Sequence, residues 1–400
     1  MNRPAHILPV IIFSQFTGAS LWFSGNAVIL DLQRDWGLSG HSTGYAISAV
    51  ILGFVAGTLL FAFFNLADRY SPGRVFFIST LAGAFANAAL LVVPPGPTSL
   101  LLLRFATGFC LAGIYPVGMR IAAGWYDHGL GRALGFLVGA LVLGTAFPHL
   151  IRASGTELHW QLVVSWVSLL ALSGGVAMLV LVPDGPHLPQ GSAFDPRALA
   201  SVFRSRRFRA SACGYFGHMW ELYTFWAFVP LLLLAYGRSR GIDIDVSLWS
   251  FAIIAAGAVA CAGGGVLSSR VGSAPVAAAL LAVSGACCLL SPLMFDAGLP
   301  LFIGFLLLWG FSVSSDSPQF SALNAAYAPR EYVGSALTVV NSIGFLITIP
   351  SIQLADFLLT RVEPRYLFWM LVPGPILGIW AFRPLLRNRR AELSSPPKGQ

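Results

Sequence analysis

Two ionisable side chains interrupt an aromatic and aliphatic stretch of the chain, GYFGHMWELYTFW at residues 214–226. His218 and Glu221 are three residues apart, so on a helix they share one face. A carboxyl group removed from water is protonated more readily than an exposed one, and histidine titrates near neutral pH. The pair is therefore predicted to carry or gate a proton. The alternative is a neutral hydrogen-bonded pair that only joins two helices.

A second polar stretch, GFSVSSDSPQFSALN at residues 310–324, places Asp316 two residues before Pro318. A proline inside a helix frees a carbonyl group one turn back, and nearby hydroxyl groups can satisfy it. Asp316 is predicted to couple transport or bind a solute; alternatively, it is the polar cap of a broken helix. Arg104 also stands within an apolar run and is predicted to face a cavity or a partner. Its alternative is to extend to the nearer membrane surface.

The elements that must position these groups are membrane-spanning helices. The chain is 56% hydrophobic and only 10% charged, whereas soluble domains carry about 25% charged residues. Its apolar runs reach the roughly 20 residues that a helix needs to cross a bilayer, and they lack the alternation of a barrel strand. We therefore predict an all-α polytopic membrane protein with twelve spans. They cover residues 7–30, 43–64, 74–94, 98–122, 130–152, 160–182, 209–236, 246–268, 273–293, 299–323, 332–356 and 363–386.

Basic residues predict the orientation of these spans. Of the 24 lysines and arginines, 17 lie in segments on the side of the termini, 6 lie on the opposite side, and Arg104 lies within a span. Because cytoplasmic segments are enriched in basic residues, both termini are expected to face the cytoplasm. The use of arginine, with Lys398 as the single lysine, favours a bacterial source and hence the inner membrane. A nucleic-acid partner is not expected, since no soluble domain carries a clustered basic face.

The two halves of the chain repeat each other. Gly108-Phe109, Pro116 and Pro148 recur 202 residues later, as Gly310-Phe311, Pro318 and Pro350. We predict a six-span half at residues 1–182, a cytoplasmic linker at 183–208, a second six-span half at 209–386 and a disordered cytoplasmic tail at 387–400. Since six is an even number, both halves enter the membrane from the same side. Secondary transporters are commonly built from such duplications.

The short segment LADRYSPGR, which follows the second span, resembles the signature loop of the major facilitator superfamily. Leu66, Ala67, Asp68 and Arg69 match the signature and Arg74 supplies its later basic residue, whereas Phe64 and Ser71 replace two of its glycines. The resemblance implies that Asp68, Arg69 and Arg74 form a conformational latch between the halves. The alternative is a short solvated turn.

Arg104 also resembles the arginine of that family's fourth helix. In the family, spans one, four, seven and ten line the cavity, which implies that Glu221, His218 and Asp316 are proton-coupling residues. The segments GHMWELY and SLWFSGNAV are similar to nitrate/nitrite or cyanate-type porters. Nitrate itself is not expected, because spans two and eight contain no arginine.

Candidate solute contacts lie on several of these spans. They are Arg104, Gln15, Trp22, Asn26, Tyr115, Tyr215, Gln319 and Asn341. The aromatic residues Trp220, Tyr223 and Trp226 are expected to divide between the cavity wall and the lipid face.

We therefore expect a monomeric secondary active transporter that moves a small polar or anionic solute by alternating access and is coupled to protons. The alternatives are a proton-driven drug or metabolite exporter and a non-transporting receptor on the same fold. No cofactor is expected, because the chain has no nucleotide-binding loop. No metal is expected, because His218 and Glu221 supply two ligands where a site needs three or four. An enzyme is not expected, because the chain shows no nucleophile motif.

Overall fold

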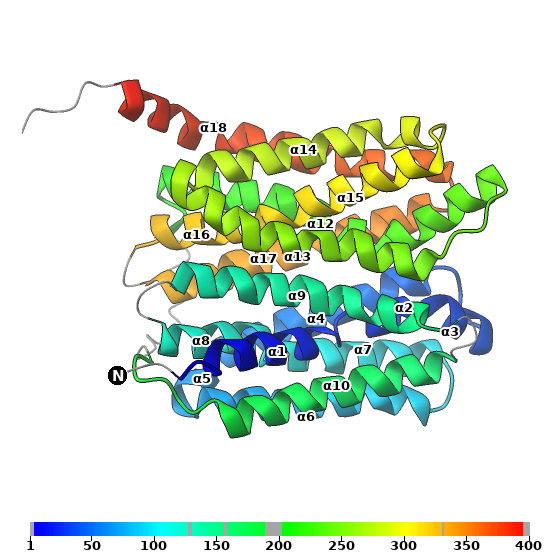
Figure 1. The fold of residues 1–400 in the computed structure, drawn as a ribbon, viewed down its shortest axis with the longest axis horizontal. Helices are drawn as coiled ribbons and strands as arrows, with labels where there is room; N and C mark the ends of the chain where they lie inside the picture. Colours follow the sequence, from blue (N-terminus) through cyan, green and yellow to red (C-terminus); the bar gives the residue numbers. More distant parts are fainter. Residues whose placement is uncertain (1–3, 127–129, 156–158, 189–201, 330–331, 395–400) are drawn as a thin grey trace, which may run out of the picture.

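The computed structural model describes residues 4–126, 130–155, 159–188, 202–329 and 332–394. Within these ranges the secondary structure is entirely helical, and the long helices run roughly along one axis (Figure 1). The first half contains α1 (Ile7–Ala19), α2 (Ser24–Ala27), α3 (Ile29–Asp35), α4 (Ser42–Phe63), α5 (Leu66–Arg69), α6 (Pro72–Ala88), η1 (Ala89–Leu91), α7 (Pro97–Leu111), α8 (Tyr115–Trp125), α9 (Leu130–Ala153) and α10 (Trp160–Leu181). The second half contains α12 (Arg206–Arg240), α13 (Val246–Val271), α14 (Ser273–Met294), α15 (Leu299–Ser315), α16 (Ser317–Tyr327), α17 (Val333–Leu358), η3 (Pro364–Leu371) and α18 (Pro373–Ser394).

Among the described residues, eleven helices are long and apolar enough to cross a membrane. The predicted span at residues 7–30 is not among them, because its longest helix, α1, has only 13 residues. Its chain leaves the helix after Ala19 and continues through the short helices α2 and α3. With this broken first span, the structure confirms the predicted all-α membrane fold.

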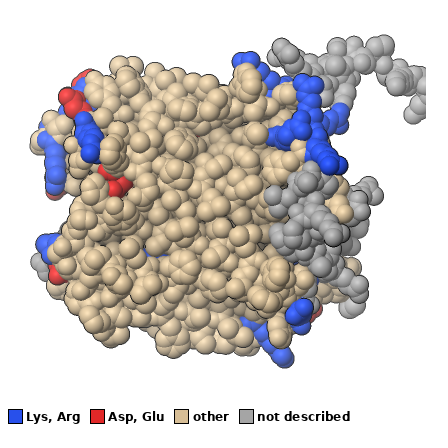
Figure 2. Space-filling view, turned by 180° about the vertical axis from the view of Figure 1, so that it is seen from behind, with Lys and Arg blue, Asp and Glu red and all other residues tan. Residues whose placement is uncertain are grey.

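The chain forms two bundles that lie side by side (Figure 1). Helices α1–α10 make one bundle and α12–α18 the other, and they meet where α9 packs on α13 and where α4 packs on α17. The first and last described helices reach the same end of the molecule, here called the terminal end (Figure 1). Figure 2 shows the molecule from behind. On this face the charged side chains gather at the two ends, and a wide uncharged belt lies between them. That belt is the surface that a bilayer would cover.

The repeat of 202 residues appears directly in the helices. The pieces α8, Tyr115–Trp125, and α16, Ser317–Tyr327, begin and end at positions 202 apart. Gly108 and Gly310 occupy the same place in the two halves. A side chain on Gly108 would collide with the backbone oxygen of Val50, and one on Gly310 would collide with that of Ile253. The repeated glycine thus allows α7 to cross α4, and α15 to cross α13, at backbone contact.

Replacing either repeated glycine by alanine is expected to destabilise the protein. The new methyl group in Gly108→Ala or Gly310→Ala meets backbone that cannot move aside, and such overpacking costs about 1–3 kcal/mol. The measurement is the thermal unfolding midpoint of the purified protein. Gly304→Ala, on the open face of α15, is the matched control and is expected to unfold at the wild-type temperature or higher. Equal midpoints for all three variants would contradict the close crossing.

Candidate functional site

Glu221 lies in the middle of α12 and is fully buried. Its Oε1 atom accepts hydrogen bonds from the hydroxyl of Ser284 and the indole Nε1 of Trp309, the latter at 2.8 Å. The thiol of Cys288 lies 3.4 Å from the same oxygen. These partners come from α14 and α15, so the carboxyl group joins three helices of the second half.

His218 lies one turn before Glu221 but pairs with Asp316 instead. Its Nδ1 atom is 2.9 Å from Oδ1 of Asp316, and the two side chains are 1% and 0% exposed. The rings of Tyr215 and Phe320 lie on either side of the imidazole, with centroids 5.9 and 6.0 Å away. The neutral His218–Glu221 pair considered from the sequence is therefore not the arrangement found.

Asp316 occupies the break between α15 and α16. Pro318 deprives the carbonyl of Ser314 of its usual partner, and the thiol of Cys261 lies 3.4 Å from that oxygen. The hydroxyl groups of Ser314 and Ser315 donate to carbonyls one turn earlier in the helix. The carbonyl that Pro318 frees thus has a partner of its own, and the carboxyl group of Asp316 interacts with His218 and with the backbone N–H groups of Asp316 and Ser317.

Arg104 is buried with 1% of its surface exposed, which excludes the alternative that it extends to the membrane surface. Its Nη2 atom donates to the carbonyls of Leu21 and Trp22, at 3.0 and 2.7 Å. Its Nη1 atom donates to Oδ1 of Asn87 at 3.2 Å. The two carbonyls belong to the break in the first span, so the guanidinium supplies the hydrogen bonds that the broken helix lacks.

The two halves therefore contain corresponding buried polar centres, a guanidinium group in the first half and a carboxyl group in the second. Arg104 connects the first, third and fourth spans through Leu21, Trp22 and Asn87. Glu221 connects the seventh, ninth and tenth spans, which are their counterparts in the repeat. Each centre joins, by hydrogen bonds, the three corresponding spans of its own half.

An aromatic cluster joins the two halves near the middle of the molecule. It consists of Trp22, Phe23, Phe54, Tyr223, Trp226 and Phe345. The ring of Trp22 lies 4.8 Å from Phe54 of its own half and 5.5 Å from both Tyr223 and Phe345 of the other half, between centroids. All six side chains are buried, whereas Trp220 is partly exposed. Sequence patterns did not indicate Phe54 and Phe345, because an aromatic residue in a span is as common on the lipid face.

Three of the predicted solute contacts, which are at or near Trp22 and Phe23 in the sequence, have side-chain polar atoms without a hydrogen-bond partner among the described residues. Gln15, Trp22 and Asn26 are buried, and among the described residues their side-chain nitrogens have no hydrogen-bond partner. Nε1 of Trp226 likewise has no hydrogen-bond partner among the described residues. Buried polar groups are nearly always hydrogen-bonded, so these atoms need partners that the described residues do not supply.

The other predicted contacts differ in exposure. Tyr215 and Gln319 are buried, whereas Tyr115 and Asn341 are partly exposed. Their roles in binding stay predictions.

The predicted latch lies at the terminal end of the molecule. Arg69 and Arg74 are exposed there, and the side chain of Asp68 lies outside the described residues. The turn is made by Asn65, whose backbone is left-handed with φ 51°, a conformation that asparagine tolerates. Phe64 has ordinary backbone angles, so the chain needs no glycine at that position. The latch itself stays a prediction.

Sequence reasoning missed two polar contacts that join the halves at the opposite end. Nδ1 of His41, in front of α4, lies 2.6 Å from Oδ2 of Asp356 on α17. One turn away, the amide of Gln353 donates to the hydroxyl of Ser48 at 2.8 Å. His41 and Asp356 are 315 positions apart, and neither belongs to a motif, so only the packing of α4 on α17 reveals the contact.

Comparison with known proteins agrees with this architecture. The model of the Major Facilitator Superfamily matches residues 10–349. The human organic anion transporter MFSD10 (TETRAN) has a TM-score of 0.72 at 15% identity, over 95% of this chain and 100% of that one. A mutant form of the nucleoside transporter NupG has a TM-score of 0.70 at 14% identity, over 95% and 99% of the two chains.

One curated relative, an uncharacterised 38 kDa protein in the 23S RNA operon of Thermoproteus tenax, is 30% identical over 218 residues. The match covers 51% of this chain and 52% of that relative, so the chain spans about half the length of the relative. The family match and the eleven helices long enough to cross a membrane together define a multi-pass membrane protein. The chain belongs to the Major Facilitator Superfamily.

Removing the guanidinium of Arg104 is expected to destabilise the protein even without a solute. Arg104→Gln leaves the carbonyls of Leu21 and Trp22 short of donors inside the bundle, at a cost of about 2–4 kcal/mol. The measurement is the thermal unfolding midpoint of the solute-free protein, with Arg270→Gln on the exposed end of α13 as control. An anion-binding role alone would instead leave this midpoint unchanged and remove only the stabilisation by added anions.

Proposed function

We propose that this transporter moves a small polar solute by alternating access of its two halves and couples that movement to protons. The observation that carries the proposal is the buried pair of His218 and Asp316, which lies one helical turn from Glu221. Ionisable groups within a membrane protein are costly and are usually retained for function. Three of them in one region of the second half supply sites at which a proton can be bound and released.

The pairing supports a specific role for each residue. Asp316 sits where α15 gives way to α16, so protonation of its carboxyl group would weaken the attraction to His218 at the point where the helix is already interrupted. Glu221 is tied to three donors and links α12 to α14 and α15. We assign proton exchange to Asp316 and His218. Glu221 either transmits their protonation state to the neighbouring helices or carries the proton itself.

Solute binding is proposed at the unpaired polar atoms of Gln15, Trp22 and Asn26, of which Trp22 belongs to the aromatic cluster. This place lies where residues of the two halves meet, which is where an alternating-access transporter must hold its solute. Arg104 is not proposed as an anion contact, because its guanidinium donates to Leu21, Trp22 and Asn87. A neutral polar solute therefore fits the site better than an anion.

A second candidate function, a proton-driven drug or metabolite exporter, is supported by the aromatic cluster. Flat apolar or cationic compounds stack well on such rings. The two functions differ in the direction of transport, which is measured as uptake or extrusion of the compound by membrane vesicles. The cytoplasmic position of both termini, the bacterial inner membrane, the monomeric state and the linker at 183–208 belong to the same proposal. The predicted disordered tail at 387–400 is corrected in its first part, because α18 continues as a helix to Ser394.

The Asp316→Asn protein is expected to exchange solute across the membrane but not to accumulate it. An amide at this position cannot take up the proton that would drive accumulation. A thermal-shift screen of sugars, nucleosides, amino acids, small anions and cationic dyes at two pH values first identifies a ligand. Counterflow and proton-driven uptake of that ligand are then compared in proteoliposomes.

Glu221→Gln is measured in the same assay. Accumulation at the wild-type level by both variants would show that neither carboxyl group couples transport. Ser173→Ala, on the exposed face of α10, is the control and is expected to accumulate the ligand as the wild type does.

Breaking the contact between His41 and Asp356 is expected to open the end of the molecule opposite the termini more often. A contact of this half-exposed kind contributes at most about 1 kcal/mol, which corresponds to a change of up to about fivefold in the open fraction. The measurement is the rate at which a membrane-impermeant maleimide labels Ile51→Cys, a buried position one turn beyond Ser48 on α4, in a Cys213→Ser background, with and without His41→Ala or Asp356→Asn. Arg34→Gln, at the same end, is the control, and equal rates in all backgrounds would contradict the role of this contact.

A further inference from the structure

A groove of about 400 Å³ lies on the outer surface of the second half, between α12, α17 and α18. Its walls include Cys213, Phe216, Trp220, Leu377 and Trp380. Leu377 and Trp380 are 62% and 64% exposed, so the groove opens toward the surroundings of the bundle and not toward its centre. Because this face belongs to the uncharged belt of membrane-spanning helices, the surroundings are lipid chains.

Small residues form the floor of the groove. A side chain on Gly217 would collide with the backbone of Gly374, and one on Gly378 would lie 3.3 Å from Cα of Gly217. Helices α12 and α18 therefore touch at their backbones, while the larger residues on either side stand up as walls. The groove results from this close packing of α12 on α18.

One stripe of α12 connects the groove to exposed basic residues. Arg206, Arg209, Cys213, Phe216 and Trp220 follow one another at spacings of three and four, so they lie along one side of the helix. Arg206 and Arg209 are exposed at the start of α12, at the terminal end. The guanidinium of Arg209 donates to the carbonyls of Phe203 and Arg204, which holds it beside the helix start.

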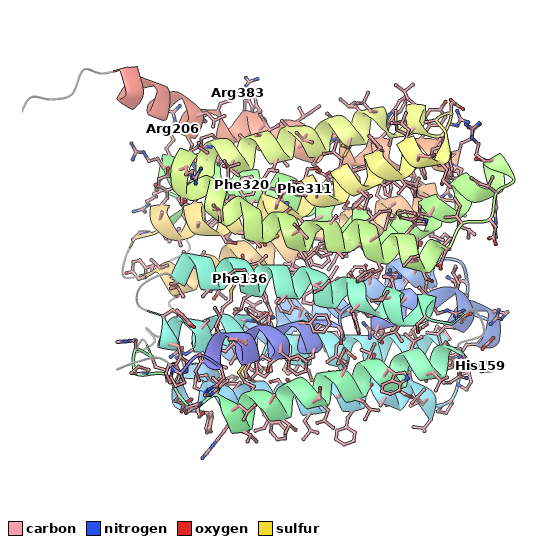
Figure 3. All side chains as sticks on the ribbon, in the orientation of Figure 1. Phe136, His159, Arg206, Phe311, Phe320 and Arg383 are labelled. Atoms are coloured by element: carbon pink, nitrogen blue, oxygen red, sulfur yellow. The ribbon has the colours of Figure 1, made fainter. Side chains whose placement is uncertain are left out.

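Helix α18 brings a third arginine to the same level. It runs antiparallel to α12, with Gly378 beside Gly217 and Phe382 beside Gly214. In this register Arg383 lies within about one helical turn of Arg209 along the axes, at 1.5 Å per residue. Figure 3 shows Arg206 and Arg383 toward the terminal end of the second half, and Arg383 is exposed.

We propose that this groove binds an anionic phospholipid, with an acyl chain between α12 and α18 and the phosphate at Arg206, Arg209 and Arg383. The apolar walls accept the chain, and the three positive charges attract a headgroup with a net negative charge. A zwitterionic lipid gains much less from the arginines. A second copy of the protein fits less well, because membrane orientation would place the arginines of both copies at the same end of the contact.

Quenching of Trp380 fluorescence tests the proposal. The protein is placed in equimolar vesicles of phosphatidylcholine and phosphatidylglycerol, in which either one or the other lipid carries brominated chains. The contribution of Trp380 is the difference between the wild type and Trp380→Phe, since the chain contains 11 tryptophans. Brominated phosphatidylglycerol is expected to quench Trp380 at least about fivefold more effectively than brominated phosphatidylcholine, from the attraction of the arginines.

Two kinds of variant separate the charge from the groove. Arg209→Gln combined with Arg383→Gln is expected to abolish the preference for phosphatidylglycerol, whereas Arg270→Gln, at the same end on α13, keeps it. Ala381→Phe fills the groove and is expected to remove the preference with the arginines intact. Equal quenching by both lipids in the wild type would reduce the groove to ordinary lipid contact. Protection of Trp380 from both lipids would indicate a second copy of the chain, and either result overturns the proposal.

Discussion

The interior of a bilayer offers no hydrogen-bond partner to a peptide group, so every interruption of a spanning helix needs a donor or acceptor from elsewhere in the protein. The first span is interrupted between α1 and α2, and Arg104 donates to the carbonyls there. The tenth span is interrupted at Asp316, where the thiol of Cys261 lies 3.4 Å from the carbonyl oxygen of Ser314 that Pro318 deprives of its helical partner. These two interruptions lie at the places where side chains of the two halves and the buried charges come together. The ionisable groups Arg104 and Asp316 thus lie where the backbone of a spanning helix is interrupted and its peptide groups need hydrogen-bond partners.

The corresponding centres of the two halves differ chemically because the groups around them differ. In the first half, the groups that require partners are carbonyl oxygens, which accept hydrogen bonds, so the centre is the cation Arg104. In the second half, the donors are the side chains of Ser284 and Trp309, so the centre is the carboxyl group of Glu221. Duplication preserved the three-helix arrangement and the glycine crossings at Gly108 and Gly310. It did not preserve the chemistry that fills the arrangement, which is a guanidinium group in the first half and a carboxyl group in the second.

The spans and the duplication could be predicted from the sequence because the membrane imposes them on composition and length. The pieces α8 and α16 fall 202 residues apart, as the repeated glycine and proline indicated. The interruption of the first span could not be predicted, because residues 20–23 contain neither proline nor charge and their partner Arg104 lies more than 80 positions away. Likewise, His218 and Glu221 share a face by spacing, but the partner of each depends on how α12 rotates against α14 and α15. Helix rotation is set by packing between distant segments, which hydropathy does not encode.

The distribution of contacts between the halves bears on how the molecule would move. At the end opposite the termini, α4 and α17 are joined by polar contacts through His41 and Ser48. In the middle, they are joined by the rings of Phe54 and Phe345, whose centroids lie 4.6 Å apart. Rings can slide past one another with little loss of contact, whereas a polar contact is lost once its atoms separate by an ångström or so. The aromatic cluster therefore suits a pivot that persists through a rocking motion, and the polar contacts suit a closure that is made in one state and broken in the other.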